Sequence, residues 1–288
     1  MVIKRLMRML RRKMSSLSSG GEPDSASLQS QKSEQYRGMA SEINDFCGSL
    51  DGLRILEVGP GGADNNLSSY IAENFNVRKV VAIDPVANPL KKGNRLEIIR
   101  GDIRKTDFAD DEFDLITSIA AFEHIPDLNL ALEEMYRILR PGGLLYTKFG
   151  PIWSGPWGHH LWVRGNNSLY TYSNTALPSY CHLLMSEQEI LAHCTEVMNI
   201  PTEDARLIAR FACENSGQNR LFYSDYEQIV RDSPFQTLFF YGINKFPLTG
   251  SYAVGDYRKL LLDLNSRFPG KSGWNHNSIF MLLCKHEK

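Results

Sequence analysis

The stretch LRILEVGPGGADNN, Leu53–Asn66, decides how the rest of the chain is interpreted. Its first part, Arg54–Val58, is apolar and rich in β-branched residues, which predicts a short buried strand. Glycines follow at positions 59, 61 and 62, where they allow a tight turn and a close approach of ligand to backbone. The polar residues at positions 64 to 66 are suited to cap a following helix. This corner predicts a nucleotide site, although a tight strand–helix connection without a ligand has the same pattern.

Two acidic residues narrow the choice of ligand. Glu57 lies two residues before Gly59, where a carboxylate would repel a pyrophosphate but attract an amino group or a sulfonium. Asp84 comes 25 residues after Gly59, at the end of the predicted strand Val77–Ile83. An acidic residue at that offset can bind the hydroxyls of an adenosine ribose. Unless Asp84 is only a loop residue, these positions favour a positively charged adenosine compound over a dinucleotide.

The charge of the chain is unevenly distributed. The 288 residues carry a net charge of −1, yet the first 14 hold six basic residues and no acidic ones. The remainder therefore carries −7, which makes it a poor partner for a phosphate backbone. We expect no nucleic-acid partner.

The five cysteines are widely spaced and form no Cys-x-x-Cys pair. This pattern favours free thiols in a reducing compartment over a disulfide framework or a zinc site. No apolar run approaches the roughly 18 residues that a membrane-spanning helix needs. We therefore expect a cytoplasmic protein, with peripheral membrane contact as an alternative.

The N-terminal segment has three interpretations. Residues 1–14 place apolar side chains at helical spacing between basic ones. They could form a solvated leader, an amphipathic helix on an anionic membrane, or an organellar transit peptide. Residues 15–33 are polar and low in complexity, which predicts a flexible linker. We expect residues 1–35 to precede a single large domain, residues 36–288.

Strand and helix patterns alternate along that domain. Strands are predicted at Arg54–Val58, Val77–Ile83, Leu96–Arg100, Phe113–Ile119, Leu144–Phe149, Gln236–Ile243 and Ser278–His286. Helices are predicted at Ser41–Leu50, Leu67–Phe75, Ala131–Leu139, from Ser186 with a capping box to Glu189, at Thr202–Cys213, Ser224–Asp232 and near Asp256–Phe268. This order predicts a doubly wound α/β fold with a mostly parallel, seven-stranded sheet. Residues 151–235 are expected to form an aromatic loop and a helical cap inserted after the fifth strand.

Four sequence pieces, in this order, carry a resemblance to a known family. They are EVGPGG at 57–62, AIDP at 82–85, GDI at 101–103, and FDLITSIAAFEHIPD at 113–127 followed by LRPGGLLYT at 139–147. The chain resembles the class I S-adenosylmethionine-dependent methyltransferases, of the small-molecule type related to quinone-biosynthesis methyltransferases. The resemblance implies a Rossmann-like methyltransferase fold with S-adenosylmethionine as cofactor.

The resemblance also implies a set of cofactor-binding residues. Glu57 would lie near the methionine amino group, Asp84 would hold the ribose diol, and Asp102 would accept from the adenine amino group. The full set is Glu57, Gly59, Gly61, Asp84, Asp102, Ile103 and Ile119. The chain departs from the family pattern at Ala63, where a third glycine is common, and at Ile119, where a polar residue is common.

Histidines are the candidates for the chemistry. Methyl transfer requires that the acceptor be positioned and water be excluded, and an oxygen acceptor also needs a base. His124 follows the fourth predicted strand, and His159 and His160 follow the fifth, so all three are candidate catalytic residues. His124 could instead brace its loop, and the adjacent pair could be structural. Two neighbouring histidines without a carboxylate do not define a metal site, so we assign no metal ligands.

The sequence thus predicts an enzyme that methylates a small-molecule or sugar acceptor, at oxygen. Two alternatives are an NAD(P)-linked oxidoreductase on a similar scaffold and a non-catalytic module that binds the cofactor. The non-catalytic module remains an alternative because Ile119 occupies a position at which the family often has a polar residue.

Overall fold

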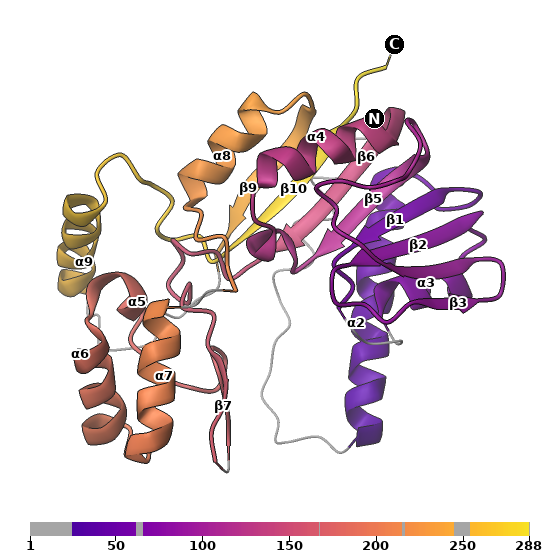
Figure 1. Ribbon diagram of the computed structural model, residues 1–288. Helices are drawn as coiled ribbons and strands as arrows, with labels where there is room; N and C mark the ends of the chain where they lie inside the picture. Colours follow the sequence, from indigo (N-terminus) through magenta and orange to yellow (C-terminus); the bar gives the residue numbers. More distant parts are fainter. Residues whose placement is uncertain (1–24, 62–65, 167, 215–216, 245–253, 288) are drawn as a thin grey trace.

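The computed structural model describes residues 25–61, 66–166, 168–214, 217–244 and 254–287 (Figure 1). The basic leader and the first part of the predicted linker lie outside these described residues. Within them, none of the helices combines the length and hydropathy that crossing a membrane requires.

One sheet organises the molecule. Its strands are β1 (Arg54–Val58), β2 (Lys79–Asp84), β3 (Leu90–Lys92), β4 (Leu96–Arg100), β5 (Phe113–Ile119), β6 (Leu139–Phe149), β9 (Gln236–Ile243) and β10 (Ser278–Cys284). They lie side by side in the order β3-β4-β2-β1-β5-β6-β10-β9. The five strands from β4 to β6 run parallel, whereas β10 runs antiparallel to both of its neighbours. The predicted doubly wound fold and its mostly parallel sheet are confirmed.

The sheet has eight strands where the sequence predicts seven. The additional strand, β3, pairs antiparallel with β4 at the edge of the sheet. It spans only Leu90–Lys92 and lies between Pro89 and Gly93. Three residues are too few to show an alternating pattern, and the strand exists only because β4 supplies hydrogen-bond partners.

Strand β1 lies at the point where the chain reverses its direction across the sheet. Val58 aligns with Ile83 of β2 on one side and with Ser118 of β5 on the other. The chain continues outward from β2 to β4, and later returns to place β5 and β6 on the other side of β1. Ligands of open α/β sheets bind at this position, beyond the carboxyl ends of the strands.

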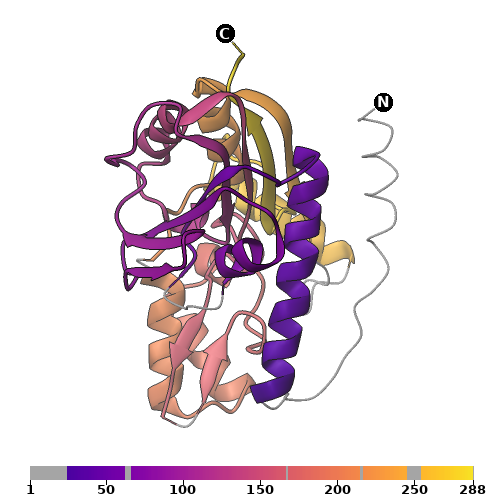
Figure 2. The ribbon, with the colours of Figure 1, turned by 90° about the vertical axis from the view of Figure 1, so that its right-hand side faces the viewer.

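Helices cover both faces of the sheet (Figures 1 and 2). On one face, α4 (Leu128–Ile138) and α8 (Tyr223–Asp232) pack on buried side chains of β1, β2, β5 and β6. On the other, α2 (Ser25–Cys47) and α3 (Leu67–Asn74) do the same. The capping role expected of positions 64 to 66 is filled by Asn66, whose side chain accepts a hydrogen bond from the Ser69 backbone.

The N-terminal helix is longer than predicted. The sequence predicts a linker through Ser33 and a short helix from Ser41, but α2 begins at Ser25. Once the buried half around Ala40 and Ile43 is packed, each further residue adds one helical hydrogen bond for little entropy. Ser25–Ser33 contains no proline or glycine to stop that extension. The prediction of a linker there is wrong.

Strand β6 is also longer than predicted. The sequence places a helix stop at Pro141, Gly142 and Gly143, with the strand beginning at Leu144. In the structure α4 ends at Ile138 and β6 runs from Leu139. A register shift in β5, between Phe113 and Leu115, accommodates the extra residues of β6.

A smaller helical cap, residues 162–214, follows β6 and has its own apolar core. It contains the hairpin β7 (Trp162–Arg164) and β8 (Leu169–Thr171), then α5 (Cys181–Leu184), α6 (Glu187–Ala192), the π-helical turn His193–Val197 and α7 (Thr202–Glu214). The predicted capping box of Ser186 and Glu189 begins α6. Helix α8, predicted as part of the cap, packs on the sheet instead. Helix α9 (Val254–Arg267) contacts the segment that joins β6 to the cap.

Helix α5 of the cap carries a buried histidine, His182, that contacts the segment joining β6 to the cap. His182 donates from Nε2 to the Trp153 carbonyl at 2.7 Å, and its ring lies 5.9 Å from that of His159. Burial lowers the pKa of His182 to about 4. The five cysteines are all unpaired thiols, as predicted.

We predict that this histidine makes stability depend on pH. Between about pH 6.5 and 4 the unfolded chain binds a proton at His182 that the folded chain does not. The unfolding free energy therefore falls as the pH drops through this window, by about 3 kcal/mol in total. Denaturant titrations should show a shallower pH slope for His182→Gln. The variant His286→Gln, at an exposed position, should keep the original slope, and equal slopes in all three proteins would contradict the prediction.

Candidate functional site

The turn after β1 requires glycine at position 59, because a Cβ there would clash with the loop after β5. Gly59 has φ = +73°, and an ideal Cβ built on it would lie 2.4 Å from the Cβ of Ala121. Its backbone N–H donates to the Ile83 carbonyl at 2.9 Å. The turn is therefore held between the end of β2 and the loop that follows β5, at a spacing that only glycine permits.

Asp84 ends β2 and faces that turn. Its carboxylate is buried, and Oδ2 accepts from the Gly61 backbone at 3.2 Å while Oδ1 accepts from Val86 at 2.9 Å. A carboxylate has about four lone-pair sites, so two remain for a ligand. An ideal Cβ on Gly61 meets no described atom within 4 Å, so the turn leaves open space beside Asp84.

Glu57 lies beside a cavity of about 220 Å³. The cavity is bounded by α2, the glycine turn, the start of α3 and Ile119. The Glu57 carboxylate is buried and accepts from both the backbone and the hydroxyl of Ser68. Burial nevertheless raises its pKa to about 7. A ligand ammonium here would favour the charged carboxylate and lower that pKa.

The other predicted cofactor residues lie along the same edge of the sheet. Asp102 follows β4 and is partly exposed, and Arg104 donates to both of its carboxylate oxygens. These hydrogen bonds lower the pKa of Asp102. Ile103 is buried in the main core, and Ile119 lines the small cavity.

These residues fit a positively charged adenosine cofactor. The sheet brings together a glycine turn, a buried carboxylate with spare acceptor sites, and a second carboxylate beside a small cavity. Helix α2 adds Gln35, Tyr36 and Met39 to that cavity, which sequence patterns did not reveal. Burial and the nearby Glu57 charge raise the pKa of Tyr36.

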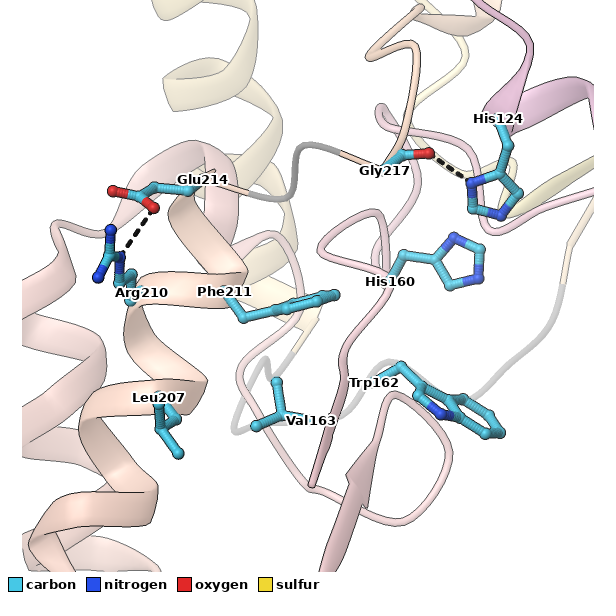
Figure 3. Close-up of a pocket in the computed structure, with 9 residues that line it drawn as sticks. All are labelled: His124, His160, Trp162, Val163, Leu207, Arg210, Phe211, Glu214 and Gly217. Atoms are coloured by element: carbon cyan, nitrogen blue, oxygen red, sulfur yellow. Dashed lines mark hydrogen bonds and ion pairs between the residues drawn. The ribbon is translucent and has the colours of Figure 1, made fainter. Parts of the chain in front are cut away.

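A second, larger cavity of about 760 Å³ lies between the sheet edge and the cap (Figure 3). Its cap side is formed by Trp162, Val163, Leu207 and Phe211, and the ion pair of Arg210 with Glu214 borders it. His124, His160 and Gly217 form the side toward the sheet. The two cavities meet the same part of the chain, because Ile119, at the end of β5, lines the small one and His124, five residues later, lines the large one.

His124 ends the short 3₁₀ turn Phe122–His124 that follows β5. Its Nδ1 lies 2.6 Å from the Gly217 carbonyl (Figure 3). A carbonyl can only accept, so Nδ1 carries the proton and the neutral ring has its lone pair on Nε2. The side chain is exposed toward the larger cavity.

His160 lies beside His124 on the same side of the cavity, with ring centroids 5.0 Å apart. Its Nδ1 lies 2.8 Å from Nε2 of Gln218, which also donates to the Pro151 carbonyl at 2.7 Å. Burial, with the neighbouring His124, lowers the pKa of His160 to about 4. Its φ of +47° is in the left-handed region that non-glycine residues rarely adopt.

His159 is placed elsewhere. It is buried near His182, and its Nδ1 accepts from the Leu161 backbone at 3.2 Å. Burial lowers its pKa well below the ordinary value. The structure therefore brings together His124 and His160, which are distant in sequence, and directs the adjacent His159 away from the larger cavity.

The segment Gly217–Asn219 contacts both histidines, and no sequence pattern predicted its role. Gly217 contacts His124, Gln218 contacts His160, and Asn219 donates from Nδ2 to the carbonyls of Phe122 and Ile125 at 2.8 and 3.1 Å. Polar residues after a helix are common in loops, so no local signal distinguishes this segment.

The strand order, the glycine turn and the acidic end of β2 define a class I methyltransferase fold, whose methyl donor is S-adenosylmethionine. Residues 56–147 match the sequence model of the family described as methyltransferase domain, so this part of the chain is similar to that family. The resemblance seen in the sequence is confirmed for this part of the chain.

Several characterised proteins are similar in this region. The demethylmenaquinone methyltransferase of Staphylococcus carnosus is 30% identical over 122 residues, 39% of this chain and 44% of that protein. The fatty-acid O-methyltransferase of Mycolicibacterium smegmatis is 31% identical over 114 residues, 37% of this chain and 41% of that protein. The similarity thus spans less than half the length of these relatives.

Among solved structures, phosphoethanolamine N-methyltransferase 2 of Haemonchus contortus has a TM-score of 0.47 and 15% identity. The superposition covers 87% of this chain and 53% of that one.

We predict that Gly59→Ala damages both stability and cofactor binding. The new Cβ would overlap Ala121 and force the turn away from β5, at about 3 kcal/mol of unfolding free energy. Gly270→Ala is the matched control, because Gly270 also has positive φ but no described atom within 4 Å of its ideal Cβ. It should lose only about 1 kcal/mol in a denaturant titration. Equal losses in the two variants would show that contact with Ala121 is unimportant.

Proposed function

We propose that the chain transfers a methyl group from S-adenosylmethionine to an oxygen atom of a small-molecule acceptor bound in the larger cavity. The observation that carries this proposal is the position of the loop after β5. Ile119, the strand residue immediately before this loop, lines the small cavity at the glycine turn. His124, at the far end of the loop, lines the large cavity. Cofactor and acceptor would approach each other across this loop.

The cofactor supplies a methyl group on a sulfonium sulfur, which needs no metal or redox group to leave. Asp84 would accept hydrogen bonds from the ribose hydroxyls, and Glu57 would balance the positive charge near the amino group. Asp102 and the Ile103 backbone would lie at the adenine, while Gly59 and Gly61 would let the cofactor approach the backbone. The protein's main contribution is alignment and exclusion of water.

The lining of the larger cavity favours an acceptor with an apolar body. Trp162, Val163, Leu207 and Phe211 form one wall, and Trp162 and Leu207 are 62% and 49% exposed. Large apolar side chains left open to solvent often mark binding surfaces. The relatives act, by name, on demethylmenaquinone and fatty acids, which supports an apolar acceptor over a free sugar.

The two histidines support oxygen as the methylated atom. A hydroxyl is a poor nucleophile unless it loses its proton, and the neutral tautomer of His124 with its proton on Nδ1 would offer the Nε2 lone pair as an acceptor. His160 stays neutral near pH 7 because burial lowers its pKa to about 4. We assign the activation of the hydroxyl to this pair, and give His159 no role in it.

Calorimetric titration with S-adenosylhomocysteine tests the cofactor assignment. The wild-type chain should bind with micromolar affinity, and Asp84→Asn should bind at least tenfold more weakly because it loses charge-assisted hydrogen bonds. Asp110→Asn, which changes an exposed carboxylate, should bind normally. If the wild-type chain did not bind S-adenosylhomocysteine, the NAD(P)-linked oxidoreductase would become the favoured alternative. Binding of S-adenosylhomocysteine without turnover on any acceptor would favour a non-catalytic module.

Acceptor recognition predicts a second, separate effect. Phe211→Ala should raise KM for long-chain or aromatic hydroxyl acceptors about tenfold, because it removes a large apolar surface from the cavity wall. It should leave the affinity for S-adenosylhomocysteine unchanged. Leu130→Ala, at an exposed position on α4, is the control and should change neither value. An unchanged KM in Phe211→Ala would place the acceptor elsewhere.

A further inference from the structure

We propose that Glu123, His124 and His160 form a binding site for a divalent transition-metal ion of the zinc class, on the sheet side of the larger cavity. One candidate ligand atom from each residue lies within 4.8 Å of the other two. Two imidazoles and one carboxylate are a donor set that zinc takes in catalytic sites. The three residues come from two loops, after β5 and after β6, that only the folded sheet brings together.

Glu123 supplies the main evidence for a cation. Its side chain is 1% exposed, and Oε1 accepts from the Gly150 backbone at 3.0 Å. Its other oxygen, Oε2, is buried and has no hydrogen-bond partner among the described residues. Burial raises the pKa of this carboxyl group, against the smaller opposing effect of His124. A buried carboxylate oxygen without a partner is unfavourable, and a bound cation would remove that penalty.

His124 is oriented as metal-binding histidines usually are. Such histidines donate their second ring N–H to a carbonyl or carboxylate, which fixes the ring and its tautomer. Nδ1–H of His124 donates to the Gly217 carbonyl, so Nε2 is left as the ligand atom. Figure 3 shows the two imidazole rings side by side at the same end of the cavity.

His160 needs a change of tautomer to join them. Gln218 donates to its Nδ1, which places the ring proton on Nε2. Metal binding at Nε2 would move that proton to Nδ1, and rotation of the Gln218 amide would offer Oε1 as its acceptor. Oε1 of Gln218 is buried and without a partner among the described residues, so the rotation gives it one in exchange for the hydrogen bond from Nε2 to the Pro151 carbonyl. The strained backbone of His160, with φ = +47°, is also typical of functional positions.

Three protein ligands would leave one coordination position of the metal ion free. Ligand atoms around tetrahedral zinc lie roughly 3.3 Å apart, so small side-chain rotations from the present spacing would close it. Glu123 is buried, His160 is partly buried and His124 is exposed, so the protein ligands lie on one side. The fourth position would face the larger cavity.

The consequence for chemistry rests on the proposed function. An acceptor hydroxyl at the fourth position would have a lowered pKa and release its proton to solvent. Its oxygen would then form the new O–CH₃ bond while the S–CH₃ bond breaks and sulfur takes the electron pair. In this arrangement His124 and His160 still activate the hydroxyl, but they do so by holding the metal ion and not by taking the proton themselves.

The test uses the full chain, treated with a chelator and then titrated with Co²⁺ and Zn²⁺. We expect one equivalent of Zn²⁺ by calorimetry, and a visible absorption band for Co²⁺ at the same stoichiometry. Glu123→Gln, His124→Asn and His160→Asn should each weaken binding 10-fold to 100-fold or more. Glu123→Gln retains an acceptor for Gly150, and His160→Asn introduces a residue that tolerates positive φ. His286→Gln, at an exposed histidine, is the matched control and should bind normally.

The outcomes separate this proposal from the proposed function. Absence of metal binding, or binding that survives both Glu123→Gln and His160→Asn, would overturn the metal site. Loss of metal binding in a variant counts as support only if that variant still binds S-adenosylhomocysteine with wild-type affinity, which shows that it is folded. Cofactor binding and turnover without any metal would leave the methyltransferase proposal intact and refute this one.

Discussion

The contact between Gly59 and Ala121 is the constraint on which the site depends. Because Gly59 has no Cβ, the turn after β1 can lie against the loop after β5, at a distance that any other residue would increase. The first loop belongs to the cofactor edge and the second leads to Glu123 and His124. One missing methyl group therefore fixes the spacing between the position of the donor and the groups that would act on the acceptor.

A second constraint comes from far along the chain. The segment Gly217–Asn219, between α7 and α8, contacts the loops after both β5 and β6. Asn219 also accepts from the Tyr226 hydroxyl at 2.9 Å, which links the segment to the buried face of α8. Because these polar contacts join the loops after β5 and β6 to α8, the orientation of the two histidines depends on the packing of these distant segments.

The two buried glutamates at this edge of the sheet, Glu57 and Glu123, would each be stabilised by a neighbouring positive charge. Ser68 satisfies Glu57, yet burial still raises its pKa to about 7. Glu123 has one satisfied oxygen and one without a partner among the described residues. Burying carboxylates in this way opposes folding, and each becomes favourable when a cation lies beside it. The sulfonium cofactor of the proposed function, at Glu57, and the proposed metal ion, at Glu123, would be such cations.

The sequence by itself determined the features that arise from local interactions. The strand at Arg54–Val58, a helix cap among positions 64 to 66 and the capping box at Ser186 follow from periodicity and from side-chain to backbone hydrogen bonds within a few residues. The tertiary structure decided what depends on distant partners. It added β3, extended α2, and paired His124 with His160 instead of His159 with His160. Neighbouring residues in a turn point in different directions, so only the tertiary contacts of the segment after β6 select which histidine reaches the cavity.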